Sequence, residues 1–173
     1  YFDVVRKERE SVLREFPDNF EVEANLSSTY SNIAGCLSGL GRDAEALSAI
    51  EKAIDIISGL YDLRPTSYGP NYFQYLGNAV TLAYWSGNRR QAEKYIDALA
   101  DLGDDLASRG NAFMSLPYAA RLVKHDYLQA IGRRVNDSDY DAVLQYVPGT
   151  LQNDWILVNL IRWRETNGSL MKR

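Results

Sequence analysis

The chain has 173 residues, of which 46% are hydrophobic and 24% charged, and this is the composition of one ordinary folding unit rather than of two domains with separate cores. No stretch approaches the roughly 18 consecutive apolar residues of a membrane span. The formal net charge of -4 offers little of the counterion release that drives nucleic-acid binding. We therefore expect neither a membrane nor a nucleic acid as partner.

The inventory of reactive side chains is small. Cys36 is the only cysteine and His125 the only histidine, so a thiolate metal cage and a two-histidine metal site cannot form within the chain. Nothing in the sequence assembles a nucleophile, a base and an orienting residue into a catalytic triad. The stretch GLGRDA (residues 39–44) matches a dinucleotide fingerprint, but it follows an amphipathic helix instead of the buried strand which that motif needs. We expect no enzyme activity, no catalytic residue, no metal and no cofactor. A single cysteine fits a reducing compartment, and we expect a cytoplasmic location.

Residues 1–16 predict the first helix, with apolar positions at Val4, Val5, Val12, Leu13 and Phe16. We interpret it as the second helix of a preceding repeat, in a chain that is a piece of something longer. The stretch EFPDNF, which contains a proline, predicts the linker that follows.

Residues 21–62 predict a helix, a tight turn and a second helix. Apolar or small residues recur at steps of three and four on both sides of Gly41, first from Tyr30 and then from Ala46. Glycine suits the left-handed end of a helix, and Asp43 suits the start of the next one.

Residues 70–108 repeat this arrangement after the predicted linker LRPTSYGPNY. Asn32, Gly41, Ala46 and Ile50 recur 46 residues later as Asn78, Gly87, Ala92 and Ile96. Small alanines are needed where paired helices cross closely, and one hairpin cannot cover its own apolar face. We therefore expect Ala46 and Ala92 to be buried and neighbouring hairpins to stack.

Residues 112–173 are less regular and predict a degenerate repeat followed by C-terminal capping helices. A helix from about Leu116 to Val135 contains Gly132, which lies 45 residues after Gly87. The apolar stretch TLQNDWILVNLIRWRETNG predicts a last helix that ends near Gly168.

Together these residues resemble the tetratricopeptide repeat. The aromatic, small, glycine and alanine positions of that pattern are met by Tyr30, Ala34, Gly41, Ala46 and Ala53. The period of 46 exceeds the usual 34 and is similar to the longer kinesin-light-chain-like variety. HEAT and armadillo repeats match the period better, but the glycine turn followed by alanine favours the tetratricopeptide pattern. The resemblance implies an all-α fold, a right-handed superhelix of about three antiparallel helix hairpins.

Stacked hairpins line a concave groove with their first helices. The residues that we expect to bind a peptide there are Ser28, Asn32, Gln74, Asn78, Thr81 and Trp85. Asparagine offers both a donor and an acceptor to a peptide backbone, and the resemblance implies this use for Asn32 and Asn78. The alternative is that these are polar residues on a hydrated face and that the aromatic residues around Trp85 pack between repeats.

The sequence thus predicts a scaffold that binds a protein or peptide segment, within a larger regulatory or signalling protein. The alternative is a structural or oligomerisation domain that forms a homodimer or packs against the rest of its parent chain. The apolar stretch WILVNLIRW (residues 155–163) supports either a capping helix or such an interface.

Overall fold

The computed structural model describes residues 2–135, 138, 141 and 155–172. Every regular element in these ranges is helical, with seven α-helices and one 3₁₀ helix, so the all-α prediction is confirmed there. None of the helices in the described ranges combines the length and the apolar character needed to cross a membrane. The chain forms two compact units, Tyr1–Asn88 and Arg89–Arg173. That the whole chain is a single superhelical repeat domain stays a prediction.

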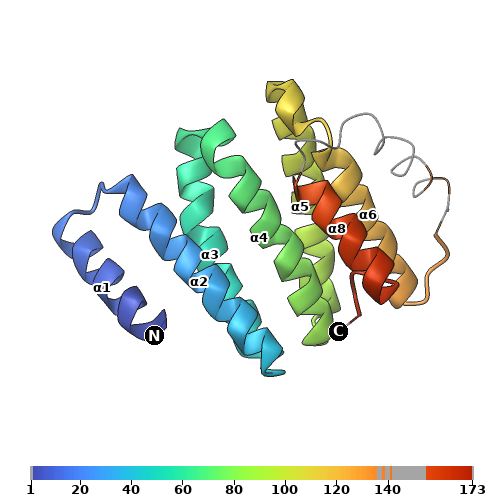
Figure 1. Ribbon diagram of the computed structural model, residues 1–173, viewed down its shortest axis with the longest axis horizontal. Coiled ribbons are helices and arrows are strands. Elements are labelled where there is room, and N and C mark those ends of the chain that lie inside the picture. The colour runs from blue at the N-terminus through green and yellow to red at the C-terminus, as the bar shows by residue number, and fades with distance from the viewer. Residues whose placement is uncertain (1, 136–137, 139–140, 142–154, 173) are drawn as a thin grey trace. The chain divides into compact units, whose positions relative to one another are not determined.

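The first unit contains α1 (Phe2–Glu15), α2 (Phe20–Gly39), α3 (Asp43–Leu63) and α4 (Pro65–Trp85). Each of these helices packs against the next one along the chain (Figure 1). Ala46 is completely buried, as expected, and so are Ile50, Ala53 and Ile57 on the same face of α3. On α2, Tyr30 and Ala34 are buried too. The apolar stripes read from the sequence therefore form the core of this unit.

Three glycines end helices in the same way. Gly41, Gly87 and Gly132 have φ angles of 74°, 78° and 76°, in the left-handed region that glycine tolerates. The main-chain N–H of the residue after each glycine donates to the carbonyl five residues earlier, over 2.9, 2.8 and 2.9 Å respectively. This is the Schellman arrangement, which satisfies the last carbonyls of a helix. The predicted stops at Gly41 and Gly87 are confirmed, and Gly132 ends a third helix similarly.

The predicted linker before the second repeat is wrong in its extent. Helix α4 begins at Pro65 and passes through Pro70, whereas the sequence predicted a linker that includes both prolines. Proline suits the first helical position because the N–H that it lacks would have no partner there. Gly69 precedes Pro70 and, having no Cβ, relieves the clash that proline imposes on its predecessor. Pro70 has no N–H to donate to the carbonyl of Thr66. Thr66 is an exposed residue in the first turn of α4, so this carbonyl lies in an exposed part of the helix.

Helix α1 attaches to α2 through polar contacts. The Glu10 carboxylate accepts from the Tyr30 hydroxyl at 2.6 Å and from Arg6 at 2.8 Å. The Tyr30 hydrogen bond, together with Arg6, lowers the pKa of Glu10 against the opposing effect of burial. Of the apolar positions predicted in the first helix, Val4 is 60% exposed, and Phe16, which follows the end of α1, is 57% exposed. Its role as the second helix of a preceding repeat stays a prediction.

The second unit contains α5 (Arg89–Arg109), η1 (Asn111–Phe113), α6 (Leu116–Ala130) and α8 (Trp155–Asn167). Within it, α5 packs against α6 and η1, and α6 packs against α8. Ala92 is completely buried, as expected. Helix α6 is shorter than predicted because Gly132 ends it before Val135. The last helix ends at the predicted place, next to Gly168.

The buried carboxylate of Asp126 on α6 binds α8 and the residues that follow it. Asp126 is completely buried, and its oxygens accept from Arg164 Nε on α8 at 2.9 Å and from the main-chain N–H of Leu170 at 2.7 Å. His125 Nδ1 lies 3.3 Å from the same carboxylate. A buried charge needs such partners to offset its loss of hydration. His125, the only histidine, thus belongs to a structural cluster.

Candidate functional site

The candidate site lies on the first unit, where α2 and α4 run side by side in the same direction (Figure 1). The hydroxyls of Ser28 on α2 and Tyr75 on α4 are 3.2 Å apart, so the two helices are in direct contact at this level. Tyr75 is buried and Ser28 is half-buried. This places the first helices of the two predicted repeats next to each other.

All six predicted peptide-binding residues lie on these two helices. Asn32 and Asn78 are exposed, whereas Ser28, Gln74, Thr81 and Trp85 are half-buried. On α4 the four predicted residues follow one another at steps of three and four, which puts them on one helix face. On α2, Asn32 follows Ser28 by four residues, which puts these two residues on one helix face as well. The structure therefore groups the predicted residues into two neighbouring stripes.

The hydroxyls in these stripes are already engaged by their own helices. Ser28 Oγ donates to the carbonyl of Ala24 at 3.1 Å, and Thr81 Oγ1 donates to the carbonyl of Gly77 at 3.4 Å. Such bonds compete with any ligand for the hydroxyl proton. The amides of Asn32 and Asn78 are consequently the stronger candidates for contact with a ligand.

Two asparagines that the sequence reasoning missed extend the stripes. Asn25 on α2 is exposed and Asn71 on α4 is half-buried. They lie seven residues before Asn32 and Asn78, close to two full helical turns, and therefore on the same faces. The 46-residue repeat that relates Asn32 to Asn78 also relates Asn25 to Asn71, so the sequence alone could have identified them.

Several of the aromatic residues near the site pack inside the unit. Phe73 and Tyr75 are buried, and the rings of Tyr61 and Tyr72 meet at a centroid distance of 5.6 Å. Burial raises the pKa of the Tyr72 hydroxyl, and the nearby carboxylates of α3 add to this effect. The packing interpretation thus holds for these aromatic residues, whereas Trp85 keeps part of its surface exposed.

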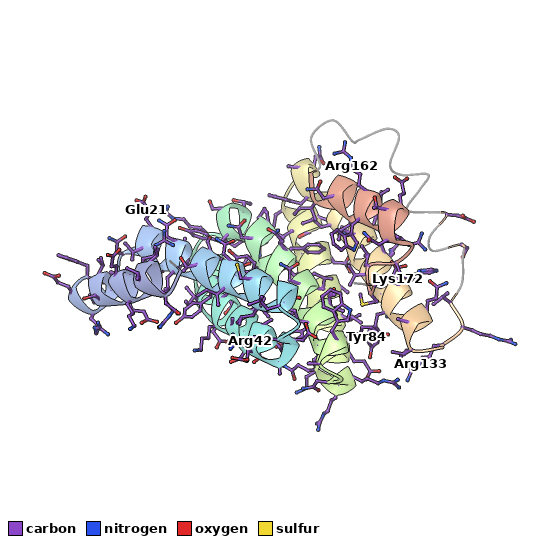
Figure 2. The ribbon with its side chains drawn as sticks, turned by 60° about the horizontal axis from the view of Figure 1, so that its bottom comes forward. Glu21, Arg42, Tyr84, Arg133, Arg162 and Lys172 are labelled. Atoms are coloured by element: carbon purple, nitrogen blue, oxygen red, sulfur yellow. The ribbon has the colours of Figure 1, made fainter. Side chains whose placement is uncertain are left out.

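The two helices of the site carry almost no charge. Helix α4 contains no charged residue, and on α2 the only two are Glu21 and Glu23 in the first turn. Figure 2 shows Glu21 near the start of α2 and Arg42 beyond its other end, between α2 and α3. Helix α3 instead carries six charged residues, which are Asp43, Glu45, Glu51, Lys52, Asp55 and Asp62. Beyond the first turn of α2, helices α2 and α4 therefore contribute no charge of their own, and the guanidinium of Arg9 on α1 lies against Asn25 and Thr29 of α2.

Among the described residues, no group of three or more histidine, cysteine, aspartate or glutamate side chains is arranged to hold a metal ion. The chemistry that the site offers is hydrogen bonding by neutral amides. An asparagine side chain donates through its NH₂ and accepts through its oxygen, which matches the C=O and N–H of a peptide unit.

Comparison with protein-family models, with curated proteins and with solved structures finds no match for this chain. The resemblance to tetratricopeptide repeats accordingly depends on the residues named above.

Proposed function

We propose that the first unit binds an extended segment of a partner protein along the face formed by α2 and α4. The observation that carries this proposal is the placement of Asn32 and Asn78. They are exposed, occupy equivalent positions of the 46-residue repeat and lie on two helices in direct contact. The protein would then be a binding scaffold of the tetratricopeptide type.

Two further features support a binding surface. The buried apolar residues of α2 and α4, such as Ala34, Leu76 and Val80, lie away from these stripes, in the core, so the polar stripes take little part in holding the unit together. The stripes also contain amides instead of the long charged side chains that usually cover a hydrated helix. An amide desolvates at a lower cost than a charge, which suits a surface that must bind and release.

The test uses peptides selected by the whole chain from a displayed library of random dodecapeptides. We expect the double variant Asn32→Ala, Asn78→Ala to bind the selected peptides about tenfold or more weakly, since each amide supplies one or two hydrogen bonds. Fluorescence polarisation measures the affinity. Thermal unfolding should be unchanged or slightly raised, because alanine favours exposed helix positions.

The matched control is Asn159→Ala, which removes an exposed asparagine from α8, far along the chain from the site. It should leave the affinity for the same peptides unchanged. If the double variant binds as tightly as the wild type, the proposed use of Asn32 and Asn78 is wrong.

An oligomerisation role is the second candidate, and the exposure of Trp163 supports it. This side chain on α8 is 50% exposed, and large exposed aromatic residues are typical of interfaces. Light scattering at several concentrations tests the idea. A stable dimer that Trp163→Asp dissociates would favour it, and a monomer at all concentrations would count against it.

A further inference from the structure

Helix α8 ends on an asparagine that is followed directly by a glycine. Asn167 is the last residue of α8, and Gly168 has a φ angle of 76°, in the left-handed region. An asparagine followed by a glycine occurs nowhere else in the sequence. Because glycine has no Cβ, its main-chain nitrogen reaches the side-chain carbonyl carbon of the preceding asparagine with little steric hindrance. The pair therefore has the chemistry of a site of spontaneous deamidation.

In this reaction the main-chain nitrogen of Gly168 attacks the Cγ atom of Asn167. A bond forms between these two atoms, and the bond from Cγ to the amide nitrogen breaks. The proton of the Gly168 N–H is transferred through water to the departing amide, which leaves as ammonia. Water then opens the resulting succinimide ring at either carbonyl, and position 167 becomes aspartate or isoaspartate. Water is the only co-reactant, and nothing is oxidised or reduced.

Both reacting groups are held in hydrogen bonds of the helix. The Gly168 N–H donates to the carbonyl of Arg164 at 2.6 Å, and Asn167 Nδ2 donates to the carbonyl of Trp163 at 2.9 Å. Ring closure requires the nitrogen of Gly168 to turn toward Cγ of Asn167, which breaks the first of these bonds. The folded end of α8 therefore holds the pair in an unreactive arrangement, and the reaction requires a local opening of the chain.

The buried carboxylate of Asp126 binds the chain on both sides of this pair. It accepts from Arg164 Nε at 2.9 Å and from the main-chain N–H of Leu170 at 2.7 Å. Arg164 comes three residues before Asn167, and Leu170, which is buried, comes two residues after Gly168. A rotation of the main chain at Gly168 has to displace one of these two contacts. The free energy of the opening therefore depends on the contacts with Asp126.

We propose that Asn167 is a site of spontaneous deamidation and isoaspartate formation, and that the contacts of Asp126 with Arg164 and Leu170 keep this site unreactive in the folded chain. The site lies in the second unit and is independent of the peptide-binding face proposed for the first unit.

Trypsin isolates the site for measurement. Cleavage after Arg164 and Lys172 gives the peptide ETNGSLMK, in which Asn167 is the only asparagine. The whole chain is incubated at neutral pH, and samples are digested briefly at intervals. Mass spectrometry follows the gain in mass as –NH₂ is replaced by –OH, and reversed-phase chromatography separates the aspartate and isoaspartate peptides.

The folded wild-type chain should deamidate at least about tenfold more slowly than the same chain in concentrated guanidinium chloride, where no contact restrains the pair. Asp126→Ala should raise the rate in the folded chain by about tenfold or more, because the open form becomes more populated. Asp126→Asn keeps one acceptor oxygen and should raise the rate less. Circular dichroism checks that each variant is folded during the incubation, and if Asp126→Ala is not, Asp126→Asn provides the comparison.

Two controls accompany these variants. Asn167→Gln should abolish the gain in mass of this peptide on the same timescale, because glutamine closes the corresponding ring far more slowly. Glu45→Ala breaks an exposed ion pair in the first unit and should leave the rate at the wild-type value.

The result that would overturn the site itself is an unfolded wild-type chain whose peptide gains no mass. A folded wild-type chain that reacts as fast as the unfolded one would show that the end of α8 does not restrain the pair. A folded Asp126 variant that reacts no faster than the wild type would show that Asp126 does not control the opening. Either of the last two results would refute the proposed protection.

Discussion

Replacement of Asp126 by alanine tests how the second unit holds the end of the chain. The Asp126 carboxylate is completely buried and accepts from Arg164 Nε at 2.9 Å and from the Leu170 N–H at 2.7 Å. Arg164 retains only 17% of its side-chain exposure. Asp126→Ala therefore removes the acceptor of both Arg164 Nε and the Leu170 N–H. Because the site is buried, water cannot fully replace this carboxylate.

The cost follows from this burial. A hydrogen bond to a charged group contributes about 1.5 to 3 kcal/mol, and removal of one partner of a buried ion pair costs about 3 to 5 kcal/mol. The two contributions overlap, so we expect a total loss of about 3 to 5 kcal/mol. For a chain of this length, this corresponds to a fall in Tm on the order of 10 °C.

Urea and thermal unfolding of the whole chain, followed by circular dichroism, measure this loss. The matched control is Glu45→Ala, which breaks a pair that is even shorter, with Arg42 Nη2 at 2.6 Å, but in which both side chains are more than half exposed. Solvent screens such a pair, so we expect Glu45→Ala to cause no measurable loss in the free energy of unfolding. If Asp126→Ala costs no more than Glu45→Ala, the reasoning from burial is wrong.

Two further predictions concern the first unit. Gly35→Ala should raise the free energy of unfolding by about 0.5 to 1 kcal/mol, because glycine is unfavourable inside a helix and a Cβ there would meet no atom within 4 Å; a loss in urea unfolding would contradict this. Glu10→Gln should destabilise α1 above pH ~4.5, where the wild-type carboxylate with its lowered pKa is charged, and the difference between the two proteins should vanish as the pH falls through that pKa. Burial raises the pKa of Glu23, but Glu23 titrates in both proteins and therefore does not affect the difference in their stability. A stability difference between wild type and Glu10→Gln that does not change with pH would refute the role of Glu10.

The features that the sequence predicted well depend on local chemistry. A glycine that follows an amphipathic stretch ends the helix wherever it stands, and Gly41 and Gly87 do so as predicted. The burial of Ala46 and Ala92 was predictable because a small residue at a repeated position indicates close packing. The start of α4 was not, since the effect of a proline on a helix depends on how far it stands from the helix start.

The features that were missed depend on contacts between distant residues. Asp126 meets Arg164 and Leu170, which are 38 and 44 residues further along the chain, and no repeat in the sequence relates them. The contact between Ser28 and Tyr75 depends on the register of two helices, which periodicity alone does not determine. The pair of Asn25 and Asn71, by contrast, was accessible from the 46-residue spacing.

The arrangement of α2 and α4 separates the residues that stabilise the unit from those that we propose to bind a peptide. The residues that hold these helices in the unit, such as Ala34, Leu76 and Val80, are buried on one face, whereas the asparagines lie on the other face. Because the two sets share no residue, changes on the polar face should alter the affinity for a peptide without altering the free energy of unfolding by more than the helix propensity of the new residue. A surface of this kind can change its ligand while the fold beneath it stays the same, which is the physical reason that stacked helix pairs suit a binding scaffold.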